Sequence, residues 1–180
     1  MFNTSGIEEK VFESKYITPG ISDVTISGIE GSNGDGKSPY VMFNFTKMNT
    51  TQTASIKFFL SEAASKRSLE KIKHIATKVV TEEAINAVSG NDAATYAQNL
   101  SKLLVGKSLR IKFSGEEVQG KDGKNNWYKA TIGLPSFAEK LGTTPSKLKF
   151  DANNNYDMKK LPVATDMSSI GGVNGSGLPF

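Results

Sequence analysis

Residues 39–60 read PYVMFNFTKMNTTQTASIKFFL, two runs rich in β-branched and aromatic residues on either side of a polar turn. This composition predicts a β-hairpin. Because successive side chains of a strand point to opposite sides, each run has an apolar face and a mixed face. The apolar face is expected to belong to the core and holds Val41, Phe43, Phe45, Ile56, Phe58 and Leu60. The mixed face is polar and basic, yet it carries Tyr40 and Phe59, two aromatic residues that a merely solvated face does not need.

A chain of 180 residues is most simply one domain with appendages. We divide it into an N-terminal extension over 1–20, a domain over 21–150 and a flexible C-terminal tail over 151–180. The tail is assigned from its richness in Asn, Gly and Ser and its few apolar residues. Two short helices are expected near the end of the domain, at 136–141 and 145–148.

The order of the expected elements predicts the fold class. Apolar residues alternate over 21–30, and again over 108–113 and 127–132, with Gly28 predicting a bulge in the first of these strands. Apolar residues at helical spacing predict a helical insert over 61–106. The short loops between neighbouring strands are hairpin connections, so the strands are expected to be antiparallel. Three strands, a helix and two strands follow the order of the OB-fold, a five-stranded Greek-key barrel. We therefore predict a mainly β, OB-fold-like barrel with an α-helical insertion between strands 3 and 4.

The strands also point aromatic and basic side chains away from the core. Aromatic platforms for bases and cations for phosphates are what single-stranded nucleic acid requires. By strand parity the outward set contains Tyr40, Met42, Lys57, Phe59, Arg110, Lys112, Trp127 and Lys129, and the flanking loops add Lys37, Lys121 and Lys124. The alternative is that the helical insert or the tail covers these aromatics as a secondary core. The insert has cations of its own, interpreted as a solvated face or as an extension of the basic track: Lys66, Arg67, Lys71, Lys73 and Lys78.

Catalytic and metal sites are not expected. The loop Gly31–Ser38 matches a phosphate-binding loop formally, but Pro39 and an alternating strand follow it, so no helix N-terminus meets the phosphates. The chain has no cysteine and a single histidine, His74, which excludes thiolate and histidine-cluster metal sites. We therefore expect no catalytic residue, no metal and no cofactor, and we expect that the protein is not an enzyme.

Residues 17–45, ITPGISDVTISGIEGSNGDGKSPYVMFNF, look like the first hairpin of a known family. Together with the strand order and the outward set, residues 17–134 resemble single-stranded DNA-binding proteins of the OB-fold type, particularly the divergent versions encoded by bacteriophages. The resemblance implies sequence-independent binding of single-stranded DNA in viral DNA replication or recombination. The terminal Leu178, Pro179 and Phe180 are similar to the tip through which bacterial members recruit replication and repair proteins. Gly175, Ser176 and Gly177 stand where those members have acidic residues.

Other readings remain open at this point. Stacking does not distinguish DNA from RNA, so RNA stays a candidate partner, and so does a second copy of the chain in a homo-oligomer. The alternative function is a structural or assembly β-barrel, such as a virion component, whose outward aromatics are buried at protein–protein contacts. The net charge of +4 is compatible with a polyanionic partner. The acidic start resembles no signal peptide and no apolar run reaches membrane-spanning length, so we expect no membrane partner and a cytoplasmic location, in a bacterial host if the protein is phage-encoded.

Overall fold

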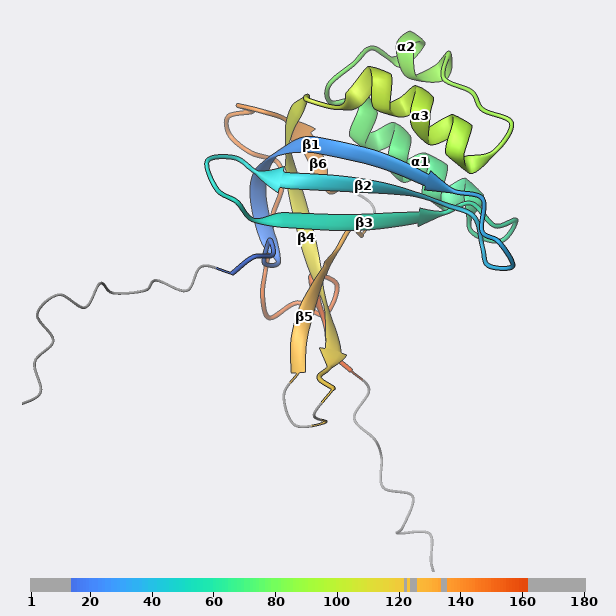
Figure 1. Ribbon diagram of the computed structural model, residues 1–180. Coiled ribbons are helices and arrows are strands. Elements are labelled where there is room, and N and C mark those ends of the chain that lie inside the picture. The colour runs from blue at the N-terminus through green and yellow to red at the C-terminus, as the bar shows by residue number, and fades with distance from the viewer. Residues whose placement is uncertain (1–13, 122, 124–125, 134–135, 162–180) are drawn as a thin grey trace, which may run out of the picture.

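A computed structural model of the chain describes residues 14–121, 123, 126–133 and 136–161 (Figure 1). The three strands, the helical region and the two further strands follow one another as predicted, and two short strands come after them. Along the described residues the elements are β1 (Gly20–Ser32), β2 (Tyr40–Lys47), β3 (Thr53–Phe59), α1 (Ser65–Ala76), α2 (Glu82–Asn86), α3 (Ala93–Leu104), β4 (Ser108–Gln119), β5 (Asn126–Thr131), β6 (Ala138–Lys140) and β7 (Met158–Lys159).

The strands form one sheet in the order β3-β2-β1-β4-β5. These neighbours are antiparallel, and β4 also pairs with β6 and, in parallel, with β7. Strand β1 is shared, since its first half pairs with β4 and its second half with β2. Its register to β2 shifts between Ile26 and Gly28, so the bulge predicted at Gly28 is confirmed. The protein is therefore mainly β, and its sheet is open: β3 and β5 stand at opposite ends of the strand order and do not pair within the described residues.

The core lies on the predicted inner face of the sheet. Val41, Phe43 and Phe45 of β2 are fully buried, as are the residues of β4 that alternate in the same way, Leu109, Ile111 and Phe113. In Figure 1 the helices gather at one end of the sheet, and the β4–β5 hairpin extends away from them. Helix α3 approaches β1 so closely that a side chain at Gly31 would collide with the backbone carbonyl of Ala93. The absence of a side chain at this position permits the contact.

Helices α2 and α3 each begin directly after a residue whose side chain caps the first turn. The side chains of Thr81 and Asp92 accept hydrogen bonds from backbone N–H groups at the starts of α2 and α3. Helix α1 begins at Ser65, within the predicted helical insert, and its N-cap residue, Ala64, offers no side-chain bond. None of the helices in the described part of the chain is long and apolar enough to cross a membrane.

The segment after β5 differs from the prediction. The first expected short helix is instead strand β6, which pairs with the edge of β4 that β1 leaves free, and no helix forms at 145–148. Residues 151–161 do not begin a tail, because β7 pairs with β4 and the side chain of Asp157 is buried. Short strands that depend on a distant partner leave little local pattern, which explains the error. The remainder of the expected tail, 162–180, lies outside the described residues.

Candidate nucleic-acid interface

The outer face of the β2–β3 hairpin carries two aromatic rings and a lysine in contact. The register places Tyr40 opposite Phe59, and Met42 opposite Lys57. The rings of Tyr40 and Phe59 meet edge to face with their centroids 6.2 Å apart, and the ammonium of Lys57 lies 4.3 Å from the centre of the Tyr40 ring. The lysine therefore makes a cation–π contact with Tyr40. Phe59 is 45% exposed while Tyr40 is half-buried, so Phe59 offers the more open ring.

Two cavities lie side by side between β3 and β5, and we call them together the β3–β5 groove. The first, about 660 Å³, is lined by Tyr16 of the segment before β1, by Thr53 of β3, and by Trp127 and Tyr128 of β5. The second, about 490 Å³, is lined by Met42, Lys57, Phe59, Arg67, Lys71 and Lys129, among others. Both cavities share Ser55, Lys129 and Ala130, so they adjoin. The open end of the sheet is thus a groove with an aromatic part and a cationic part.

The charge of the β3–β5 groove is of one sign. Lys57, Arg67, Lys71 and Lys129 line it, and no described acidic residue does. Among the described residues none of these four cations forms an ion pair. The ammonium of Lys71 donates to the backbone carbonyl of Ile132 at 2.7 Å, and burial together with the nearby charge of Arg67 lowers its pKa from the ordinary value. The described lining of the groove is therefore positive, and the nearest acid in the register is Glu116 of β4, which lies opposite Lys129.

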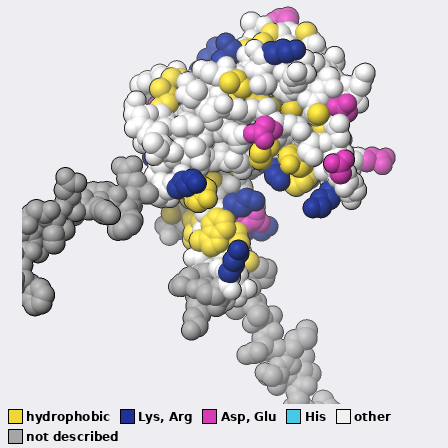
Figure 2. Space-filling model, viewed as in Figure 1, with side chains coloured by type: hydrophobic (Ala, Val, Ile, Leu, Met, Phe, Trp, Pro, Cys, Tyr) yellow, Lys and Arg dark blue, Asp and Glu magenta, His cyan; other side chains and the backbone are white. Residues whose placement is uncertain are grey.

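The predicted aromatics on β3 and β5 remain exposed. Trp127 is 52% exposed and lies on β5, and Phe59 lies at the end of β3. Helix α3 packs against β1 and β2, and α1 packs against β3 and β6 and borders the cavity that Phe59 lines, yet both aromatic side chains keep about half of their surface exposed. The helical insert therefore does not cover Trp127 or Phe59. Figure 2 shows hydrophobic and basic side chains together, with an acidic one beside them, over the region that β5 occupies in Figure 1.

Strand β5 departs from the predicted alternation. Tyr128 and Ala130 were expected on the core face, but Tyr128 is 36% exposed and Ala130 only half-buried. The reason lies in β4, whose second half leaves the main sheet and carries β5 with it (Figure 1). Within the described part of the chain no second layer lies behind this hairpin, so most of β5 is exposed on both faces. Only Ile132, just after β5, reaches the core as predicted.

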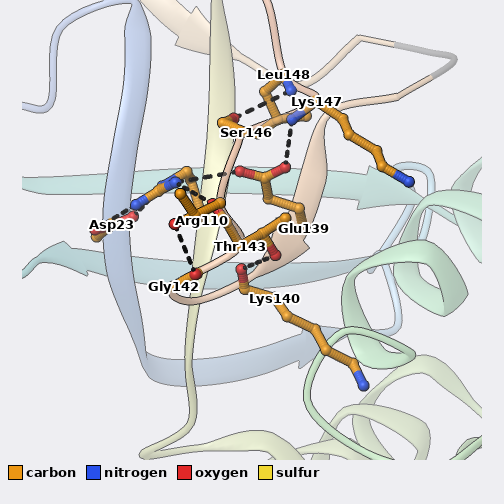
Figure 3. A network of polar contacts seen from close by, with 10 residues as sticks. Asp23, Arg110, Glu139, Lys140, Gly142, Thr143, Ser146, Lys147 and Leu148 are labelled. Carbon is orange, nitrogen blue, oxygen red and sulfur yellow. Dashed lines mark hydrogen bonds and ion pairs between the residues drawn. The ribbon is translucent and has the colours of Figure 1, made fainter.

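Arg110, predicted to contact phosphate, is held in a network of polar contacts (Figure 3). Its guanidinium donates to both carboxylate oxygens of Asp23, at 2.6 and 3.2 Å, and to Glu139 and the carbonyl of Thr143, each at 3.3 Å. The hydrogen bond to Asp23 raises the pKa of Arg110 further. Glu139 in turn accepts from the backbone N–H of Lys147. Arg110 points away from the core as predicted, but it ties β1 to the segment after β6 and does not line the β3–β5 groove.

Lys112 is also held away from the groove. Its ammonium donates to Asp157 at 2.7 Å. Burial opposes the charge of Asp157, but the hydrogen bonds from Lys112 and from the backbone N–H of Asp151 outweigh it and lower the pKa of Asp157. Strand parity placed Arg110 and Lys112 outside the core correctly but did not indicate which acids fold onto them. In the structure Arg110 joins β4 to β1 and to the segment after β6, and Lys112 joins β4 to Asp157, while their contact with phosphate stays a prediction.

Of the predicted loop and tail residues only Lys37 and Lys121 are described, and neither belongs to the groove. Lys37 and Lys121 are exposed on the β1–β2 and β4–β5 loops, and neither lines the two cavities. Lys124 lies outside the described residues, and so do Leu178, Pro179 and Phe180 of the terminal tip. The loop Gly31–Ser38 runs into strand β2 and not into a helix, which agrees with its interpretation as a hairpin loop.

Tyr16 is a groove residue that the sequence did not reveal. It is 65% exposed and precedes β1, in a stretch that was expected to be a polar extension. Tyr16 and Ile17 point to opposite sides, since Tyr16 is exposed and Ile17 is buried. This alternation is typical of an extended edge segment and is the feature that could have indicated Tyr16. Arg67 and Lys71 were interpreted chiefly as a solvated helix face, yet both line the groove. Their spacing of four residues placed them on one side of α1.

The described residues hold no group of three or more His, Asp or Glu side chains that could bind a metal ion. The single histidine, His74, packs its ring on Phe137 with centroids 4.8 Å apart. Burial and the charge of Lys78 lower its pKa, against a backbone hydrogen bond at Ala138 that raises it.

No known protein family matches the chain, and no curated protein matches its sequence.

Proposed function

We propose that this protein binds single-stranded DNA without sequence preference and without catalysis, in viral DNA replication or recombination. The observation that carries the proposal is the β3–β5 groove, in which exposed aromatic rings adjoin cations and no described acid is present. Trp127 and Phe59 supply ring faces on which unpaired bases stack. Each stacked base contributes on the order of 1–3 kcal/mol whatever its identity, because every base has a π face.

The proposal includes an OB-fold-like architecture. Its support is the strand order β3-β2-β1-β4-β5 and the helices between β3 and β4. In an OB-fold β3 and β5 come together at the closure of the barrel, and strands 2 and 3 carry the face that binds oligonucleotides. Here the groove occupies the space between β3 and β5, so the unclosed seam and the proposed binding surface are the same part of the molecule.

The cations give the bound strand its backbone contacts. Lys129 lines both cavities, and Lys57 and Arg67 line the second. A strand that follows the groove therefore meets rings and charges in turn, and its phosphates displace counterions. Affinity is expected to fall as salt rises, whereas base sequence has little effect because stacking reads no base edge.

Titration of the protein with oligo-dT, followed by Trp127 fluorescence, tests the proposal. Trp127 is the only tryptophan, so quenching on addition of DNA reports on the groove directly. We expect saturable quenching that weakens with salt, and similar affinity for strands of other sequence. Matched RNA decides whether the 2′-hydroxyl matters. The absence of quenching and of any gel shift at low salt and micromolar protein rejects the proposal.

A second function has an observation in its favour. Within the described residues β5 has no partner on its outer edge, and β3 is joined on that side only by a short bridge from Tyr16 to Thr53. Free strand edges pair readily with other chains, which suits an assembly protein such as a virion component. Light scattering separates the two functions, since a stable large assembly that ignores added DNA favours the second.

A further inference from the structure

The segment before β1 holds an exposed tyrosine on a fixed backbone. The N–H of Ile17 donates to the carbonyl of Thr53 at 2.9 Å, and the N–H of Thr53 donates to the carbonyl of Lys15 at 3.1 Å. These two bonds attach the segment to the start of β3, and the burial of Ile17 anchors it from the other side. The N–H of Tyr16 also donates to the hydroxyl of Ser14 at 3.3 Å. The ring of Tyr16 nevertheless stays 65% exposed, so the packing of the fold does not account for its position.

Tyr16 shares its cavity with Trp127. The cavity of about 660 Å³ is lined on one side by the segment before β1 and the start of β3, and on the other by residues of β5. Three exposed aromatic residues therefore border one space, Tyr16 from the segment before β1 and Trp127 and Tyr128 from β5, and Trp127 is the more exposed of the two on β5. Among the described residues that line this cavity Lys129 is the only charged one, and hydroxyl side chains such as Thr53 and Ser55 complete the lining. This part of the groove is suited to a flat, largely apolar group that carries a phosphate close by.

We infer that Tyr16 and Trp127 form a subsite that holds one unpaired nucleobase between their rings, with Lys129 at the adjoining phosphate. The inference rests on the proposed function. It extends that function by assigning residues 14–18, which precede the first strand, to the DNA-binding surface. A base between two rings stacks on both of its faces. This stacking is independent of the identity of the base, because the rings do not contact its hydrogen-bonding edge. The backbone bonds to β3 hold Tyr16 in place before DNA arrives, which lowers the entropy that ordering the ring costs on binding.

The decisive experiment compares oligo-dT with an abasic oligonucleotide of the same length. The ratio of the two affinities measures the contribution of the bases within a single protein sample. It is therefore unaffected by any change in the folded fraction. Fluorescence anisotropy of end-labelled strands gives both affinities for the wild type and for Tyr16→Ala, Tyr16→Phe and Tyr156→Ala. Tyr156 is the matched control, since it is 91% exposed and lines neither cavity of the groove.

We expect Tyr16→Ala to lower the ratio by about fivefold to about 100-fold, the loss of one stacking partner. Tyr16→Phe keeps a ring and is expected to keep the ratio within about twofold, as is Tyr156→Ala. In a double variant with Trp127→Ala, the two losses are expected to combine to less than their product, because both rings act on one base.

The inference and the proposed function fail in different ways. If the wild type binds neither strand, the proposed function itself is wrong. If the wild type prefers oligo-dT and Tyr16→Ala keeps that preference in full, the subsite is wrong and the proposed function stands. A loss as large in Tyr156→Ala as in Tyr16→Ala also overturns the subsite, because the effect then has no link to the groove.

Discussion

Lys129 lines both cavities of the β3–β5 groove, so its charge is the most informative one to remove. The substitution Lys129→Gln keeps a long polar side chain and deletes the ammonium. Single-stranded DNA releases roughly 0.7 of a counterion for each phosphate that the protein neutralises. The four groove cations therefore predict a slope of log affinity against log salt of about −2 if three of them meet phosphate and about −3 if all four do. The lower count leaves out Lys71, because its ammonium already donates to the carbonyl of Ile132.

These slopes translate into a measurable span. Between about 50 and about 200 mM salt, affinity is expected to fall by about 20- to 50-fold for the wild type. Removal of one charge makes the slope shallower by about 0.7 and the fall smaller by about 2.6-fold. Lys147→Gln is the matched control, because Lys147 is exposed and lines neither cavity. Its slope is expected to equal that of the wild type.

The assay is a series of oligo-dT titrations, followed by Trp127 quenching and repeated over the salt range. A wild-type slope near zero refutes the electrostatic part of the reasoning. Equal slopes for Lys129→Gln and the wild type show that phosphate does not reach Lys129. A shallower slope for Lys147→Gln as well shows that the strand follows another path over the surface.

Three further predictions concern the rings, the network and the histidine. Trp127→Ala and Phe59→Ala are each expected to weaken oligo-dT binding by about fivefold to about 100-fold in anisotropy titrations. Both rings are largely exposed, so an equal affinity at unchanged thermal stability contradicts their role. Arg110→Ala is expected to lower the free energy of unfolding, measured by urea titration, by about 1–3 kcal/mol. This value lies between those of exposed and buried ion pairs, because the Arg110 side chain is 23% exposed. Its DNA affinity is expected to be unchanged, and weaker binding at unchanged stability would restore Arg110 to the binding surface. Burial lowers the pKa of His74 in the folded protein, so as pH falls the histidine of the unfolded chain is protonated before that of the folded one. The free energy of unfolding is therefore expected to fall as pH drops below about 6.5. His74→Phe keeps a ring on Phe137 and is expected to remove that decline in urea titrations at several pH values, and an unchanged decline contradicts the assignment.

The sequence predicted most of the first half of the fold because that half is governed by local rules. Alternation in PYVMFNFTK and TASIKFFL placed Phe43 and Phe58 inward and Tyr40 and Phe59 outward, and the register of β2 and β3 agrees. Gly28 predicted the bulge of β1, and the helical spacing of apolar residues predicted the helices between β3 and β4. Each of these features depends on a few neighbouring residues, whose geometry the backbone imposes.

The candidate site could be predicted only in part. Trp127, Lys129, Lys57 and Phe59 line the groove, as strand parity suggested. Tyr16 was missed because a single bridge to β3 leaves no repeating pattern in the sequence around it. The β6 and β7 segments were misjudged for the same reason, since two or three residues are too few to show a period.

By parity alone Arg110 and Lys129 were equivalent: both are cations that point away from the core on strands near the end of the domain. The sequence by itself determined that they point outward, because alternation is a property of the strand. Only the tertiary structure decided that Arg110 meets Asp23, 87 residues away, and that Lys112 meets Asp157, 45 residues away. It also decided that β5 returns beside β3 and places Lys129 with Lys57 and Arg67. The physical reason is that a side chain's direction follows from its own backbone, whereas its partners depend on how distant segments pack.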